Sequence, residues 1–139
     1  MRLWHKDLID VLPQKQLLAQ WRECCGIARN IALEKSPNHI LVNRIMDYPI
    51  EEFWAYSRLI FHEMIRRGYH CDFYDFTKWF SDYEEHPKEI DPIDIFKNWH
   101  TKKYLWQCYA NLEEKHDCGG ISEEEWILIE DRMRKVNLV

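Results

Sequence analysis

Apolar side chains recur at helical spacing in several stretches of the chain. In the first stretch, residues 13–33, one stripe of apolar and small side chains has spacings of four and three, and its members are Leu17, Trp21, Cys24, Ala28 and Ile31. In an α-helix this spacing brings the side chains onto one face. The pattern therefore predicts an amphipathic helix over residues 13–33.

The second stretch, residues 49–67, carries helix signals at both ends. Pro49 stands where its missing N–H is harmless, two glutamates follow it at the positive end of the helix dipole, and Arg66 and Arg67 precede Gly68. The predicted inner face consists of Ile50, Phe53, Ser57, Ile60 and Met64, widened by Trp54 and Phe61. We expect this helix to pack against the first, because each has an apolar face to bury.

The remaining residues have weaker patterns. Residues 69–94 alternate aromatic and acidic side chains and contain two prolines, which indicates a short helix and an exposed loop. Helical spacing resumes at Thr101 and stops at Gly119 and Gly120. Ser122 with Glu125 has the spacing of a capping box, and the helix after it has the apolar stripe Trp126, Ile129, Met133 and Val136. The sequence predicts an all-α fold, with four or five helices in one compact domain spanning residues 1–139.

The composition is that of a folded protein rather than a disordered one. The 139 residues are 46% hydrophobic and include seven Trp, enough to fill one core, and the low content of Gly and Pro favours long helices. No apolar run approaches the ~20 residues that span a bilayer, and residues 1–10 lack the apolar core of a secretory signal. Five cysteines, an odd number, suit free thiols in a reducing compartment. We expect a soluble, cytoplasmic protein with no membrane partner.

The charge distribution leaves a nucleic-acid partner open for the first half of the chain only. The net charge of -5 argues against a general nucleic-acid binder. Residues 1–70 have ten Lys and Arg against eight Asp and Glu, or +2, whereas residues 71–139 have nine against sixteen, or -7. The seven histidines include no H-x-x-x-H spacing and the cysteines no C-x-x-C spacing, so neither a metal site nor a cofactor is expected.

Three segments of the chain resemble a known family in their order and spacing. They are "LLAQWREC" at residues 17–24, "SPNHIL" at residues 36–41 and "FHEMIRRGYHCD" at residues 61–72. They resemble the pyrimidine dimer DNA glycosylases of the phage endonuclease V type, and the opening "MRLWHKDLI" is similar to that of bacterial members. The resemblance covers the first half of the chain and, more weakly, "KKYLWQCYANLEEK" at residues 102–115.

The resemblance implies a small all-α enzyme that acts on damaged double-stranded DNA. Family members cut the glycosidic bond of a UV-damaged pyrimidine and then the DNA backbone by β-elimination. They use the N-terminal α-amine as nucleophile and a glutamate on the first long helix, which an arginine precedes. In this chain the glutamate corresponds to Glu23, and the arginine before it corresponds to Arg22.

Elementary chemistry agrees with this assignment. Attack on the sugar C1′ needs a neutral amine, and an α-amine with a pKa of ~8 is neutral far more often at pH 7 than a lysine at ~10.4. A carboxylate beside the sugar can stabilise positive charge and move protons. The bulk of Arg2 should keep Met1 in place, whereas a small second residue in the best-known members allows its removal. We therefore predict a catalytic site of Glu23, Met1 and Arg2.

The predicted DNA contacts lie on the first helix and near the chain end. Consecutive helical residues diverge by ~100°, so Arg22 shares its row with Gly26 and Arg29 rather than with Glu23, and this row suits phosphates. His5 and Trp4 are candidates to stack on an extruded base, with core packing of Trp4 as the alternative.

Several interpretations stay open at the level of the sequence. A family arginine is replaced around Gly26, and the basic, tyrosine-rich tail of the family is absent, both of which would weaken DNA binding. Arg66 and Arg67 are either complements of a helix dipole or phosphate ligands. The alternatives to an enzyme are a catalytically silent relative that binds nucleic acid or protein, and an unrelated helical domain. The lesion and the oligomeric state are left undetermined.

Overall fold

The apolar stripes of the sequence become helices in a computed structural model that describes residues 1–80 and 89–137. The described elements are η1 (Lys6–Val11), α1 (Gln14–Glu34), η2 (Asn43–Asp47), α2 (Ile50–Arg66), α3 (Tyr74–Thr77), η3 (Lys78–Phe80), η4 (Pro92–Asp94), α4 (Lys102–Asp117) and α5 (Glu123–Asn137). No strand occurs in these residues, and α3 with its continuation η3 forms a fifth helix beside the four long ones. The prediction of an all-α fold with four or five helices is confirmed.

The boundaries of α1 and α2 follow the signals in the sequence. α1 starts directly after Pro13 and ends where Lys35 adopts the left-handed conformation, with φ 60°. α2 starts directly after Pro49, and Gly68 with φ +87° turns the chain beyond its end. Both helices lie within one residue of the predicted ranges.

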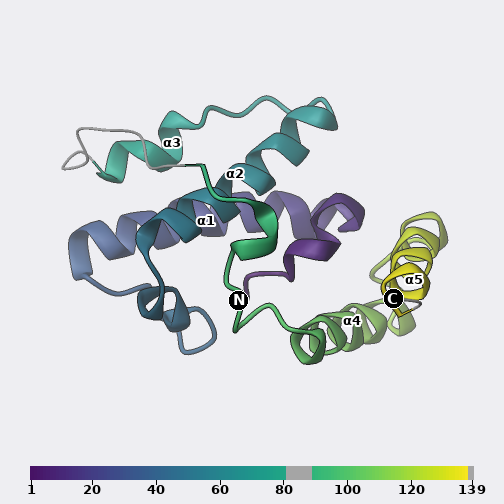
Figure 1. The fold of residues 1–139 in the computed structure, drawn as a ribbon. Helices are drawn as coiled ribbons and strands as arrows, with labels where there is room; N and C mark the ends of the chain where they lie inside the picture. The colour runs from purple at the N-terminus through teal and green to yellow at the C-terminus, as the bar shows by residue number, and fades with distance from the viewer. Residues whose placement is uncertain (81–88, 138–139) are drawn as a thin grey trace.

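The two predicted stripes pack against each other. α2 crosses α1 (Figure 1), and the two helices are in contact. The buried side chains of the two helices include Leu17, Trp21, Cys24, Ala28, Phe53, Ser57, Ile60 and Met64. This contact confirms the prediction that α1 and α2 pack against each other.

The segment after α2 covers one side of this pair. α3 and η3 contact α1, and Phe76 packs edge-on against Trp54 with ring centroids 5.5 Å apart. The short helix predicted within residues 69–94 is therefore present. Residues 81–88 of the predicted loop lie outside the described residues.

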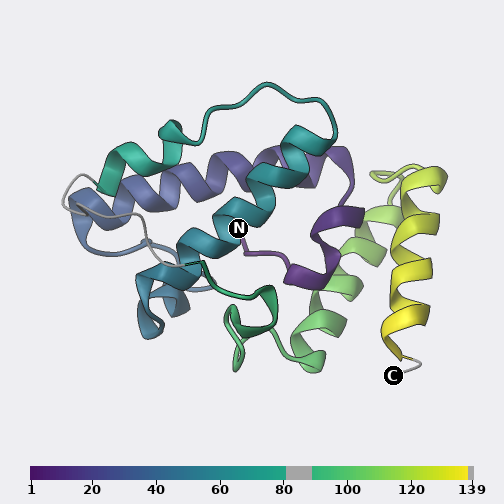
Figure 2. The same ribbon diagram turned by 45° about the horizontal axis from the view of Figure 1, so that its top comes forward.

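The helices α4 and α5 lie together at one end of the molecule (Figures 1 and 2). The Tyr109 and Trp126 rings stack between them, with centroids 5.4 Å apart. The predicted capping box is present, because the Glu125 N–H donates to Ser122 Oγ over 3.2 Å and Glu125 Oε1 accepts from Ser122. Arg132 of α5 pairs with the Asp10 carboxylate at 2.7 Å, which docks α5 on η1.

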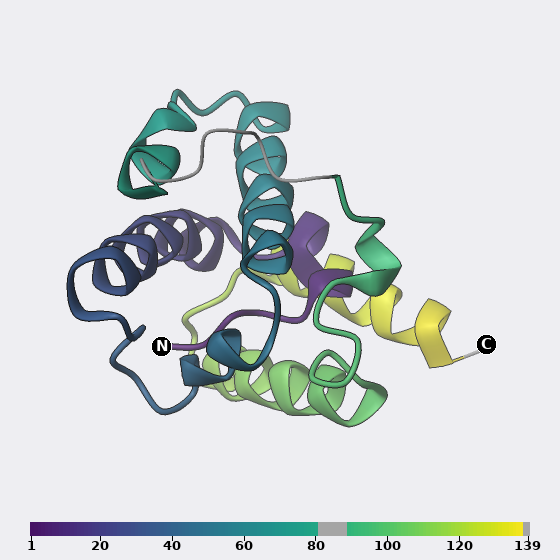
Figure 3. The same cartoon turned by 60° about the vertical axis from the view of Figure 1, so that its left-hand side comes forward.

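The N-terminal segment of the chain lies in the interior of the fold. Leu3, Trp4 and His5 are buried, and this extended segment runs between α1, α2 and α4 (Figure 3). The N-terminal residues are therefore part of the core, and only Met1 is exposed among the first five.

Candidate active site

The side chain of Gln20 ties the N-terminal segment to Glu23. Gln20 lies on the buried face of α1, and its Oε1 accepts a hydrogen bond from the Trp4 N–H over 2.7 Å. Its Nε2 donates to the Arg2 carbonyl over 3.0 Å and to Glu23 Oε2 over 2.9 Å. One amide side chain thus holds both the chain end and the carboxylate.

Two tyrosines complete the hold on the N-terminal backbone. The Tyr56 hydroxyl of α2 lies 2.6 Å from the Trp4 carbonyl oxygen and 2.9 Å from Gln20 Oε1. The Tyr104 hydroxyl of α4 donates to the Leu3 carbonyl over 2.5 Å. The carbonyls of residues 2, 3 and 4 are therefore each bound by a side chain from a different helix.

Met1 and Glu23 line the same cavity. Its volume is about 420 Å³, and its lining residues are Met1, Arg2, Trp4, Lys15, Gln16, Ala19, Glu23, Leu41, Asn111 and Lys115. The structure thus brings all three predicted catalytic residues to one pocket. The imine mechanism needs the α-amine within a few ångströms of the Glu23 carboxylate, and we predict this spacing.

This cavity is rich in positive charge. Arg2, Lys15 and Lys115 line it together with Met1, and Glu23 is the single carboxylate among its lining residues. Burial raises the pKa of Glu23 above its ordinary value, and the positive charges of the α-amine and Arg22 oppose this shift. A pocket lined by these cations suits an anionic ligand.

The predicted phosphate row lies on a different face of α1 from Glu23. Arg22, Gly26 and Arg29 line a second cavity of about 350 Å³, with Trp21, Cys25, Asp75, Lys78 and Trp79. The Arg29 guanidinium and the Lys78 ammonium lie 5.9 Å and 5.4 Å from the centroid of the Trp79 ring. Arg22 and Glu23 therefore face different cavities, as the helical geometry predicts.

Trp4 and His5 are core residues in this structure. Their exposed fractions are 7% and 2%, and His5 Nδ1 accepts from the Asp7 N–H over 3.0 Å, which caps η1. The alternative of core packing therefore describes Trp4, and burial keeps His5 from stacking on a base here. Trp4 still lines the pocket of Met1, where Arg2 and Lys115 lie 5.6 Å and 5.9 Å from its ring centroid.

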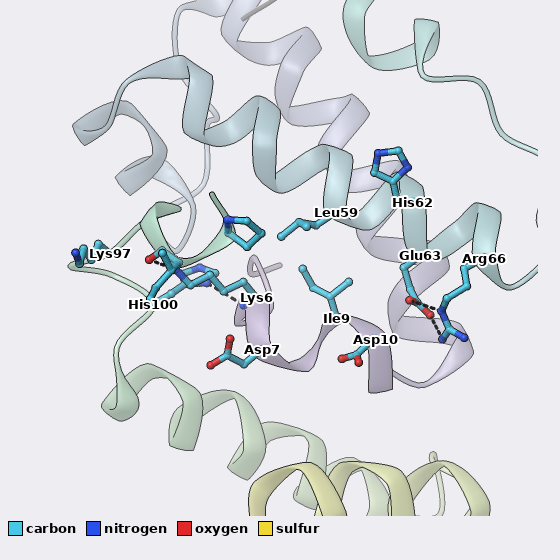
Figure 4. Close-up of a pocket in the computed structure, with 12 residues that line it drawn as sticks. Lys6, Asp7, Ile9, Asp10, Leu59, His62, Glu63, Arg66, Lys97 and His100 are labelled. Carbon is cyan, nitrogen blue, oxygen red and sulfur yellow. Dashed lines mark hydrogen bonds and ion pairs between the residues drawn. The ribbon is translucent and has the colours of Figure 1, made fainter. Parts of the chain in front are cut away.

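A larger cavity of about 770 Å³ lies between η1, α2 and the η4 region (Figure 4). The charged groups in its wall have protein partners: Glu63 binds Arg66 and Arg67, and Lys6 Nζ donates to the Ile93 and Ile95 carbonyls. Arg67 also donates to the Leu12 carbonyl over 2.8 Å. Arg66 and Arg67 thus have structural partners near the end of α2, a role that differs from both interpretations above.

Several residues that line the Met1 pocket or hold the backbone of residues 2–4 beside it have no clear sequence signal. Gln20 is the exception, because it is a polar side chain on the apolar face of a predicted helix, three residues before Glu23. From the sequence alone, Tyr56 and Tyr104 cannot be told from ordinary core aromatics, and Lys15 and Lys115 cannot be told from ordinary surface lysines. Only the fold brings α4 to residues 1–4.

The described residues place limits on other kinds of site. Within residues 1–80 and 89–137, no three His, Cys, Asp or Glu side chains lie together as metal ligands would. In the same residues, no helix is both long enough and apolar enough to cross a bilayer.

A family match covers the part of the chain that contains the predicted nucleophile and the predicted catalytic carboxylate. Residues 1–76 match the family described as pyrimidine dimer DNA glycosylase. No curated protein and no solved structure matches the chain. The match includes Met1, Arg22 and Glu23 and ends before α4.

Proposed function

The chain belongs to the pyrimidine dimer DNA glycosylase family, and we propose that it is a DNA repair glycosylase with AP lyase activity. Its substrates would be UV-damaged pyrimidines or abasic sites in double-stranded DNA. The observation that carries the proposal is the pocket that Met1 and Glu23 share, with Gln20 bonded to both the N-terminal backbone and the carboxylate.

In the proposed reaction the α-amine of Met1 attacks C1′ of the damaged nucleotide. The nitrogen lone pair forms the new bond, and the base leaves with the electrons of the glycosidic bond. Loss of a proton from nitrogen and opening of the sugar ring then give an imine. Removal of a proton from C2′ expels the 3′ phosphate by β-elimination.

Glu23 is the group proposed to move these protons. Gln20 occupies its Oε2, which fixes the carboxylate and leaves Oε1 for the sugar. Because burial raises the pKa of Glu23, its carboxylate is a better proton acceptor than an ordinary surface glutamate. Arg2, Lys15 and Lys115 are suited to hold the phosphates on either side of the sugar.

The imine makes the proposal testable, because borohydride reduces it to a stable cross-link. We expect the protein to cross-link to an abasic duplex in borohydride, with the DNA adduct on the first residue in peptide mass spectrometry. Intact-protein mass spectrometry would identify that residue beforehand. Acetylation of the chain end or an N-terminal tag should abolish the cross-link.

Two further outcomes would change the assignment. A cross-link that persists with a blocked chain end would identify a lysine as nucleophile, with Lys15 and Lys115 as the lysines that line the pocket. Glu23→Gln should bind the duplex as wild type does and lose about 10² or more in rate. If no damaged substrate gives a cross-link, the chain is a silent relative that retains the fold alone.

A further inference from the structure

Two large apolar side chains stand in solvent on the segment that joins α1 to η2. Ile40 is 83% exposed, the largest exposed fraction among the large hydrophobic side chains that the structure describes, and Leu41 is 47% exposed. Exposed apolar surface is unfavourable in water unless a partner covers it.

The segment holds these side chains in fixed positions. Val42 and Pro37 are buried on either side, and the His39 carbonyl accepts from the Val42 and Asn43 N–H groups over 3.0 Å and 2.8 Å. The His39 N–H donates to Asn43 Oδ1 over 3.0 Å. The exposure of Ile40 is thus set by a hydrogen-bonded turn.

This turn borders the proposed active site. Leu41 lines the pocket of Met1 and Glu23, and the segment passes beside the N-terminus in Figure 3. Ile40, its neighbour in sequence, is the more exposed of the two. Leu41 therefore lies in the wall of a pocket that Arg2, Lys15 and Lys115 also line, and the exposed Ile40 directly precedes it in the chain.

We propose that Ile40, supported by Leu41, is a wedge that enters the base stack of duplex DNA beside the attacked nucleotide. This inference rests on the proposed function. A sugar inside a stacked duplex cannot bring C1′ to an amine in a pocket, so the stack must be opened. Aliphatic side chains perform this in other DNA-bending proteins, where they insert between base steps and unstack them. The adjacent cations favour DNA over a protein partner, because they suit the phosphates beside the opened step.

The test compares a duplex with a single strand that needs no opening. We expect Ile40→Ser to slow borohydride cross-linking to an abasic duplex by roughly tenfold or more, and to leave the rate on the same strand without its complement within about twofold. Ile40→Leu should restore the duplex rate. The matched control is Ile127→Ser on α5, since Ile127 is also exposed, at 59%, and lines none of the three cavities.

A second measurement does not depend on the chemistry. A duplex with a tetrahydrofuran abasic analogue cannot form an imine, and 2-aminopurine beside the analogue becomes brighter when it is unstacked. Wild type should raise this fluorescence, and Ile40→Ser should bind with the same salt dependence and raise it far less.

The outcomes separate the wedge from the proposed function. Equal cross-linking rates of Ile40→Ser and wild type on the duplex, or equal losses on duplex and single strand, would overturn the wedge. A wild-type protein that brightens 2-aminopurine but never cross-links would refute the proposed chemistry and leave the wedge in place. If wild type does not raise the 2-aminopurine fluorescence, the wedge is refuted.

Discussion

At the scale of single residues, Gln20 links structure to the proposed chemistry. It is buried on α1 and makes hydrogen bonds to the backbone of residues 2 and 4 and to Glu23. Buried polar groups that lose a partner keep their full desolvation cost. Gln20 therefore supports both the stability of the fold and the position of the α-amine.

Gln20→Leu should separate these two contributions. The change keeps the size of the side chain but leaves the Trp4 N–H, the Arg2 carbonyl and one oxygen of Glu23 without this partner. We expect the free energy of unfolding in urea to fall by roughly 2–4 kcal/mol and the cross-link yield of the folded fraction to fall as well. Gln107→Leu, at an exposed position of α4, is the control. An unchanged yield in folded Gln20→Leu would show that Gln20 does not position the amine.

The sequence alone predicts part of the site at this scale. Arg22 and Glu23 diverge because neighbouring helical residues differ by ~100°, and the structure gives them separate cavities. Lys115 joins the site from α4, almost a hundred residues from Glu23. Periodicity describes one element at a time, so it contains no information on such a contact.

At the scale of elements, the predicted phosphate row on α1 has a gap at Gly26. A Cβ built on Gly26 would meet nothing within 4 Å, apart from the backbone of the helix itself, and its φ is not in the left-handed region. Glycine inside a helix is less stable than alanine by roughly 0.5–1 kcal/mol. The position thus has both the room and the conformation for a side chain.

Substitutions at Gly26 should therefore stabilise the protein. We expect Gly26→Ala to raise the free energy of unfolding by about 0.5–1 kcal/mol. Gly26→Arg should in addition tighten DNA binding and steepen the slope of log K against log salt by about one, whereas Arg22→Ala should flatten it by about one. Leu128→Arg on α5 makes the same charge change at another exposed position. An equal effect of Leu128→Arg would mean that net charge, rather than the row on α1, sets the affinity.

The limits of the elements are the most predictable part of the fold. Pro13, Pro49 and the pair of Ser122 and Glu125 act within a few residues, so they can be identified in the sequence alone. The extended path of residues 2–5 has no such signal. Its conformation depends on side chains from three helices rather than on its own sequence.

At the scale of the whole molecule, the second half of the chain completes a site that the first half begins. The family match ends at residue 76, whereas Tyr104, Asn111 and Lys115 of α4 contact or line the pocket of Met1. α5 is held to η1 by Arg132, which pairs with Asp10 and donates to the Asp7 carbonyl. The last helix, α5, is thus joined to the N-terminal part of the chain through η1.

The link between Arg132 and Asp10 should make stability depend on pH. The hydrogen bond from Arg132 lowers the pKa of Asp10. The contribution of the pair is therefore fully present above the ordinary pKa of an aspartate and is lost as the pH falls through the lowered value. Because about half of the Asp10 side chain is exposed, solvent screening limits this contribution to about 1 kcal/mol or less.

Urea unfolding of Arg132→Met measures this effect. We expect the variant to be less stable than wild type at pH 7, and the difference to shrink as the pH falls toward 3, while the bond to the Asp7 carbonyl contributes at both values. Arg134→Met, at an exposed position on the same helix, should have little effect at either pH. A difference that is the same at pH 7 and pH 3 would rule out the ion pair as its cause.

The hydrogen bonds that hold the backbone of residues 2–4 also set the order in which the site can form during protein synthesis. The proposed nucleophile precedes all of its supports in the chain, and these supports come from positions 20, 56 and 104. A nascent chain that has not yet exposed α4 lacks the hydroxyl that binds the Leu3 carbonyl, and it lacks Lys115. The proposed nucleophile therefore becomes organised only after α4 (Lys102–Asp117) has left the ribosome, so a shorter nascent chain carries the amine without the site.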